Sequence, residues 1–196
     1  MKRFTQFMLV SALFSILTGC GYNTMQAYEE AVFAAWGDVE ASYQRRADLI
    51  PNLVEVVKGY AKHEAETLQA VTEARAKVGS MQVSKQLIND PQAFTKFQQA
   101  QGELSGALSR LMVVVERYPD LKANQNVLAL QEELSSTENK VAFARQAFND
   151  SVMAYNTKRE SFPDNIFAGM FRFDAAELLN ATESAEERKA PKVSFT

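Results

Sequence analysis

The chain has 196 residues, of which 46% are hydrophobic, enough for one domain with a buried core. Its net charge of -3, with no basic face in the pattern, argues against nucleic acid as a partner. Eight glycines and five prolines are too few for a turn-rich β fold, so we expect an all-α protein.

The first twenty residues predict export and lipid attachment. Lys2 and Arg3 form a basic start, and residues 7–17 form an apolar stretch of signal-peptide length. The run Leu17-Thr18-Gly19-Cys20 that follows is similar to the lipobox of bacterial lipoproteins, in which the cysteine thiol accepts a diacylglycerol and cleavage occurs just before it. We therefore expect residues 1–19 to be a removed signal peptide and Cys20 to hold the protein at the cell membrane. Because Gly21 rather than aspartate follows, the usual sorting rule favours the outer membrane, facing the periplasm, if the source is Gram-negative.

The alternative for this segment is an uncleaved membrane anchor, because no charged residue lies between Phe4 and Tyr28. The strongly apolar part is, however, shorter than the roughly 20 residues that a helix needs to span a bilayer. Asn23, Thr24 and Gln26 would also lie poorly in lipid. The length of the apolar stretch fits a signal peptide better than a membrane-spanning helix, which favours the lipoprotein interpretation.

Apolar residues repeat at steps of three and four along the rest of the chain, which places each set on one face of a helix. The repeat is close to 3.5 residues, which implies long helices that cross at shallow angles. We therefore expect residues 20–160 to form an antiparallel up-and-down bundle with coiled-coil-like packing. The four sets are Tyr28, Val32, Trp36, Val39 and Tyr43; Leu53, Val57, Tyr60, Leu68, Val71 and Val78; Phe94, Phe97, Gln101, Leu104, Leu108, Leu111, Val115 and Tyr118; and Val127, Leu130, Leu134, Thr137, Val141, Ala144, Phe148, Val152 and Tyr155.

Helix boundaries are marked by prolines, glycines and capping residues. Pro51 removes an N–H inside a helical pattern, so we expect a kink or a new helix start there. Gly79 is expected to end the second run. Asp90 is a candidate N-cap with Pro91 in the first helical position, and the last long helix is expected over residues 124–158.

Residues 161–196 form a different kind of segment. Six large apolar side chains fall within twelve residues: Phe162, Ile166, Phe167, Met170, Phe171 and Phe173. Such a segment is too apolar for a free tail, so we expect it to fold back across the bundle. It would either cap the core or form an exposed patch for a partner protein or the membrane surface. Residues 174–180 are expected to add a short helix, followed by a polar tail.

The sequence contains no recognisable catalytic or metal-binding pattern. His63 is the single histidine, and Tyr60 stands where a Glu-x-x-His motif would need glutamate, so the di-iron site of helical bundles is excluded. A zincin helix would need a second histidine. Cys20 is used by the lipid, and neither a G-x-S-x-G nucleophile motif nor a glycine-rich phosphate loop occurs. We predict no enzymatic activity, no metal and no cofactor.

Polar side chains nevertheless lie on or beside the apolar faces. We single out one candidate polar cluster for binding: Arg46, Asp48, Asn52, Glu138, Asn139, Arg145 and Asn149. Arg75, Glu116 and Asn156 have a similar placement. These residues either form paired charges and capped carbonyls that fix the helix register, or line a polar site in the groove of the bundle. The first interpretation is favoured because buried charges need partners whatever their purpose.

Taken in order, several runs resemble the LemA family. The resemblance covers the chain from about Trp36 to Phe173, and it implies an antiparallel helical bundle at a bacterial membrane with no agreed biochemical activity. Two features depart from the family: many members look as if they keep an uncleaved anchor, and Phe148 stands where tyrosine is more typical before asparagine. The matching runs are residues 46–54, Tyr60-Ala61, His63-Glu64, Ala74-Arg75, residues 116–124, residues 130–134, Thr137-Glu138-Asn139, Ala144-Arg145, Phe148-Asn149, Tyr155-Asn156 and Phe162-Pro163.

These observations predict a non-enzymatic, membrane-tethered bundle that binds another envelope protein or supports an assembly. One alternative is a small-ligand-binding or hydrolytic protein that uses the candidate polar cluster. Another is a protein that binds the bilayer through residues 162–173.

Overall fold

The computed structural model describes residues 2–60, 64–81 and 85–180, with side chains for residues 21–60, 64–81 and 87–180. His63, which the sequence singled out, lies outside the described residues. All regular elements in the described part are helical, which confirms the predicted class. They are α1 (Lys2–Tyr60), α2 (Ala65–Gly79), the 3-10 helix η1 (Lys85–Asn89), α3 (Pro91–Arg117), α4 (Pro119–Lys122), α5 (Gln125–Glu160) and α6 (Asp164–Phe171).

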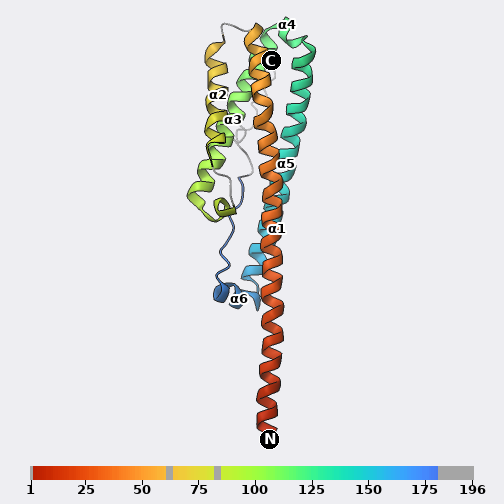
Figure 1. Cartoon of the computed structure of the whole chain (residues 1–196), viewed down its shortest axis with the longest axis vertical. Coiled ribbons are helices and arrows are strands. Elements are labelled where there is room, and N and C mark those ends of the chain that lie inside the picture. Colours follow the sequence, from red (N-terminus) through yellow and green to blue (C-terminus); the bar gives the residue numbers. More distant parts are fainter. Residues whose placement is uncertain (1, 61–63, 82–84, 181–196) are drawn as a thin grey trace, which may run out of the picture.

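The helices form the predicted up-and-down bundle (Figure 1). α1 and α5 pack along each other in opposite directions, and α2 packs against α3 and α1. α6 lies across the lower end of the bundle, against both α1 and α5, and α1 continues alone beyond it (Figure 1). Within the described residues, no helix contains a stretch long and apolar enough to cross a membrane.

At Pro51 the sequence predicted a kink or a new helix start. α1 continues through the proline without a new start, and Ile50, Leu53 and Val57 on both sides of it are buried in the same core cluster. One expectation for α1 and α2 is wrong. The apolar set that begins at Leu53 does not belong to one helix, since α1 ends at Tyr60 and α2 begins at Ala65. The pattern continues across this reversal because both helices turn their apolar faces towards the same core.

The predicted N-cap at Asp90 is confirmed. The Asp90 carboxylate accepts hydrogen bonds from the main-chain N–H groups of Gln92 and Ala93, both at 3.0 Å, and Pro91 occupies the first turn of α3. Asn124 caps α5 in the same way. These bonds satisfy N–H groups that a helix start otherwise leaves without partners.

The core has an aromatic half and an aliphatic half. In the lower half, the Trp36 ring packs against Phe94, Phe97 and Phe148, with ring centroids 5.3–5.7 Å apart. In the upper half, leucine and valine side chains of α1, α2 and α3 fill the space. Large aromatic groups in edge and tilted contacts give this lower region a specific packing.

The C-terminal segment folds back onto the bundle, as predicted, but residues 174–180 are extended rather than helical. After α6, residues 172–180 run back along α5. Phe173, Ala176 and Leu179 are buried against the bundle at steps of three residues. Side chains of α5 bind the main chain of this stretch, and these bonds replace those that a helix would have made within itself.

Candidate functional site: a clasped segment and an adjoining cleft

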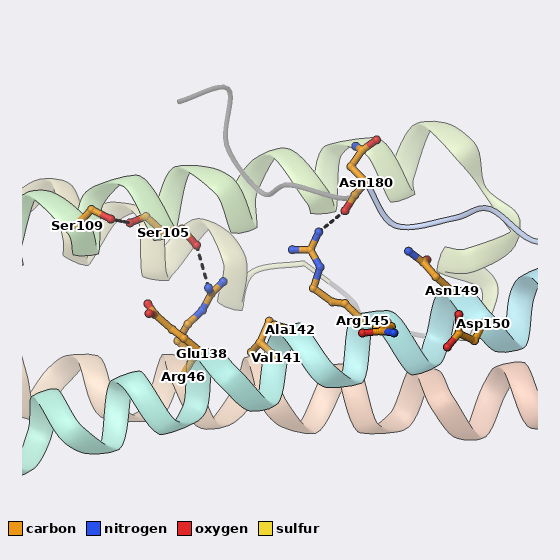
Figure 2. Close-up of a pocket in the computed structure, with 11 residues that line it drawn as sticks. Arg46, Ser105, Ser109, Glu138, Val141, Ala142, Arg145, Asn149, Asp150 and Asn180 are labelled. Atoms are coloured by element: carbon orange, nitrogen blue, oxygen red, sulfur yellow. Dashed lines mark hydrogen bonds between the residues drawn. The ribbon is translucent and has the colours of Figure 1, made fainter. Parts of the chain in front are cut away.

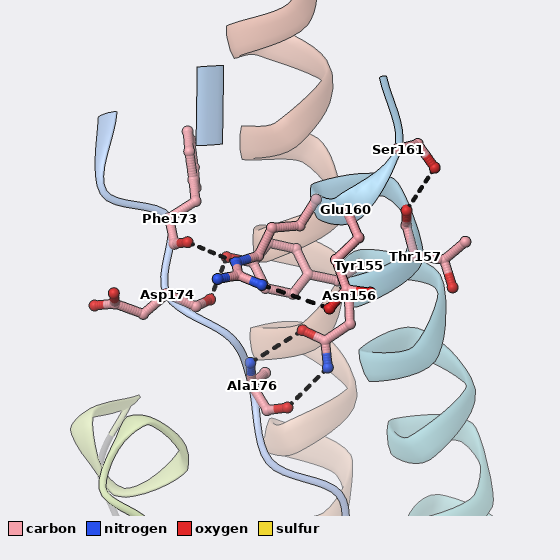
Figure 3. A network of polar contacts seen from close by, with 9 residues as sticks. Tyr155, Asn156, Thr157, Glu160, Ser161, Phe173, Asp174 and Ala176 are labelled. Carbon is pink, nitrogen blue, oxygen red and sulfur yellow. Dashed lines mark hydrogen bonds and ion pairs between the residues drawn. The ribbon is translucent and has the colours of Figure 1, made fainter. Parts of the chain in front are cut away.

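Two asparagines of α5 hold the extended segment by its main chain. Asn149 Nδ2 donates to the carbonyl of Leu179 at 3.0 Å, and the Leu179 N–H donates back to Asn149 Oδ1 at 2.8 Å. Asn156 makes the same pair of bonds with Ala176, at 2.9 and 3.2 Å (Figure 3). Each side-chain amide therefore binds one residue of the segment through that residue's main-chain N–H and carbonyl alone.

The spacing of these pairs follows from the geometry of the two elements. Asn149 and Asn156 are seven residues apart, which is about 10.5 Å along a helix. Ala176 and Leu179 are three residues apart, which is about 10 Å along an extended chain. The two repeats coincide, so a helix with asparagine at a seven-residue interval can bind an extended polypeptide at every third residue.

Further α5 side chains complete the clasp. Tyr155 donates its hydroxyl hydrogen to the carbonyl of Asp174 at 2.7 Å, and Arg159 Nε donates to the carbonyl of Phe173 at 2.8 Å. Burial raises the pKa of Tyr155 to about 12, and the negative charges of Glu29 and Asp174 add to this while Arg159 opposes it. The neutral hydroxyl is therefore maintained as a hydrogen-bond donor.

A cleft of about 570 Å³ begins where the described segment ends (Figure 2). α5 supplies one wall from Glu138 to Asp150, α3 supplies Ser105 and Ser109, and Asn180 stands at one end. The Asn180 N–H donates to Gln98 Oε1 of α3 at 2.7 Å, so the segment enters the space between α3 and α5.

Arginines of α1 and α5 form the polar interior of this cleft. Arg46 is only 1% exposed, and its guanidinium donates to Ser105 Oγ at 2.9 Å and to Gln101 Oε1 at 2.6 Å. Arg145 donates to the hydroxyl of Tyr43 at 3.3 Å and to the carbonyl of Asn180. The Arg46 guanidinium also lies 5.0 Å from the centre of the Tyr43 ring, within cation–π range.

The structure brings together only part of the candidate polar cluster. Arg46, Glu138, Arg145 and Asn149 all line the cleft. Asp48, Asn52 and Asn139 are exposed and are not among the cleft-lining residues, and Asp48 accepts a bond from Gln44 on its own helix.

The other polar positions beside the apolar faces have different surroundings. Arg75 donates to the carbonyl of Ala47 and fixes α2 against α1, whereas Glu116 pairs with Lys122 near α4. The sequence did not single out Ser105, Ser109 or Asp150, because isolated serines and aspartates on a helix give no signal of their own. The seven-residue step from Asn149 to Asn156 was a signal that could have been used.

The chemistry of the cleft suits binding of peptide-like groups. Guanidinium, amide and hydroxyl groups recognise carbonyls, carboxylates and N–H groups. Among the described residues, no group of three or more His, Cys, Asp and Glu side chains could hold a metal ion.

Comparison with known proteins places the chain. The family model described as "LemA family" matches residues 35–195. The chain belongs to the LemA family. Magnetosome protein MamQ 2 of Paramagnetospirillum magneticum is 28% identical to it over 174 residues, covering 81% of this chain and 64% of the relative. Magnetosome protein MamQ of Magnetospirillum gryphiswaldense is 27% identical with the same coverage, and Protein LemA of Metamycoplasma hominis is 23% identical over 90% of this chain and 77% of its own.

Two facts about these LemA-family relatives bear on function. The chain spans 64% of the length of the magnetosome relatives, so they contain further sequence that it does not match. Neither of the names MamQ and LemA specifies an enzymatic activity.

Proposed function

We propose that this LemA-family protein is a non-enzymatic protein of the cell envelope, tethered to the membrane by a lipid on Cys20. In this proposal, its α3–α5 cleft binds an extended segment of a partner protein. One observation carries the proposal: α5 already holds an extended polypeptide by its main chain, through the paired bonds of Asn149 and Asn156. The cleft lies next to this clasp on the same helix.

Recognition through main-chain groups is a general way to bind a partner's extended segment, because it supplies affinity without demanding particular side chains. At the junction, Arg145 donates to the last described carbonyl of the clasped segment, that of Asn180. Beyond it, the side chains of Glu138, Ser105 and Arg46 offer both acceptors and donors. A second stretch of chain entering the cleft would therefore meet groups of the kind that already bind the first.

The hydrolytic alternative is less well supported by the same residues. Ser105 Oγ accepts a hydrogen bond from the Arg46 guanidinium, which cannot take up a proton. An activated serine needs the opposite arrangement, with a base that accepts its hydrogen. Ser109 donates to the main-chain carbonyl of Ser105 at 3.0 Å, a bond within its own helix (Figure 2). The cleft therefore favours binding over acyl transfer.

Site-specific photo-crosslinking in the source bacterium tests the cleft. A photoreactive phenylalanine analogue is placed at Ala142, which lines the cleft, or at the neighbouring Phe143, which is 76% exposed and is not among the lining residues. We expect one envelope protein to be captured from position 142 and not from position 143. A Ser105→Trp substitution, which fills the cleft, should abolish that capture.

Three results would count against this function. They are equal capture at both positions, capture at 142 that survives the cleft-filling substitution, and crosslinks from 142 only to residues 181–196 of the same chain. The tether is tested separately by the mass of the mature protein, which should begin at Cys20 and carry a diacylglycerol. A mature chain that begins at Met1 and has no lipid would refute the tether.

A further inference from the structure

α6 buries one face and exposes the other. Phe167 and Ala168 pack into the bundle, whereas Phe162, Ile166 and Met170 are 81%, 53% and 63% exposed. Ile166 and Met170 are four apart and lie on one side of α6, and Phe162 lies in the turn two residues before the helix. Together with the half-exposed Phe171 they form what we term the apolar ridge.

The ridge lies beside the expected attachment point of the lipid. The ring of Phe167 packs so closely on Gly21 that a Cβ at this glycine would be 2.5 Å from the ring. The rings of Phe171 and Tyr22 are in edge contact, with centroids 4.9 Å apart. Since a helix rises about 1.5 Å per residue, this contact is within a few ångströms of the level of Cys20 along α1.

The position of Cys20 along α1 indicates what covers the apolar ridge. When Cys20 carries the lipid, its acyl chains enter the bilayer at this height, which places the ridge at the membrane surface. We infer that the apolar ridge inserts into the interfacial layer of the bilayer, so that the protein contacts the membrane at α6 as well as at its tether. The inference rests on the membrane tether of the proposed function.

The charges around the ridge fit this position. Asp164 is the single acidic residue of α6, and its carboxylate is buried on the bundle side, 2.7 Å from the ammonium of Lys158. Arg172 follows directly at the end of the helix. The apolar face of α6 itself therefore has no exposed carboxylate, and the exposed carboxylates of Glu160 and Asp174 lie on the segments before and after it. An amphipathic helix with such a face typically inserts about 5–10 Å into the membrane interface.

Contact of the ridge with the membrane would also fix the position of the cleft. A single acyl-modified cysteine leaves the bundle free to tilt, whereas two contact points restrict its orientation. Arg46 is 25 residues beyond Gly21 on α1, so the cleft would stand roughly 40 Å from the membrane surface. The ridge would thus present the cleft to partners at a defined height in the envelope.

Tryptophan fluorescence of the full-length lipoprotein in vesicles tests the inference. Phe162→Trp places the probe on the ridge, and Phe143→Trp is the matched control, an equally exposed phenylalanine on α5 away from it. The natural Trp36 is buried and gives a background common to both. The vesicles contain phosphatidylethanolamine and phosphatidylglycerol, with and without lipids brominated on their acyl chains.

We expect the Phe162→Trp protein to show blue-shifted emission and at least a twofold greater loss of intensity with brominated lipids than the Phe143→Trp protein. Flotation of the vesicles reports the tether independently. Protein that floats with the vesicles but shows no greater quenching at position 162 than at 143 would overturn the inference and leave the tether intact. Protein that does not float would refute the tether, and the inference with it. Dimerisation through the ridge would appear as a blue shift without quenching, which also overturns it.

Discussion

Replacing Asn149 with alanine removes both hydrogen bonds from its side chain to Leu179 and should loosen the end of the clasped segment. Each bond contributes about 1 kcal/mol net, so the loss is about 2 kcal/mol. The burial of Leu179 and the bonds of Asn180 to Gln98 and Arg145 remain in the variant, so the cost falls on local opening rather than on unfolding of the bundle. A local change of about 2 kcal/mol corresponds to roughly 30-fold faster exchange of the Leu179 amide hydrogen.

Amide hydrogen exchange resolved to single residues measures this directly. The Leu179 amide should lose protection in Asn149→Ala, while the amides of the core helices keep theirs. Asn149→Asp is the informative partner, because it keeps the acceptor for the Leu179 N–H but loses the donor to the carbonyl, and should give an intermediate rate. Asn139→Ala, an exposed asparagine on the same helix, serves as the control. Unchanged exchange at Leu179 in Asn149→Ala would refute the view that the side-chain amide holds the segment.

Three further predictions concern stability. Gly21→Ala should lower the free energy of unfolding by about 1–3 kcal/mol, because the new methyl group meets the Phe167 ring. Gly37→Ala, where a Cβ would have nothing within 4 Å, should raise it by up to about 1 kcal/mol. Thermal melts compare the two variants, and equal shifts in melting temperature would contradict the close contact at Gly21. Between pH 10 and 12 the protein should lose about 2–3 kcal/mol of stability, because the pKa of Tyr155 is 10.0 in the unfolded chain and about 12 in the folded one. Denaturant titrations across this pH range should show a smaller decline for Tyr155→Phe. An identical decline in the two proteins would argue against this cause. Arg172→Gly should stabilise the end of α6 by up to about 1 kcal/mol, because Arg172 has a φ of 58°, a left-handed conformation that glycine adopts without a steric cost. A lower melting temperature in this variant would show that the arginine side chain contributes more than the backbone strain costs.

Much of the bundle could be predicted because its signals are local. Asp90 and Asn124 cap helices through bonds to residues two and three positions away, so the cap and its partners are read together in the sequence. The sets that begin at Phe94 and Val127 each belong to one helix, as predicted, except that Tyr118 lies just after the end of α3; their period directly reflects the helix that buries them.

The reversal of the chain after Tyr60 was not predicted, because the signals in the sequence are local. Its apolar pattern continues across the turn, and a periodicity argument cannot tell one helix from two antiparallel helices that share a core. The N-terminal lipid signal remains a prediction from the sequence, since its chemistry depends on a short motif and not on the fold.

Only the tertiary structure decided the state of residues 174–180 and the make-up of the cleft. The segment is extended because its main-chain groups bind side chains 19 to 82 residues earlier in the chain, and no local pattern encodes those bonds. The contact of Gly21 with Phe167 joins positions near opposite ends of the chain. By itself, the sequence determined which faces are apolar and where helices begin, because these follow from neighbouring residues. It could not determine which polar groups meet across helices, because their partners are set by how the whole bundle packs.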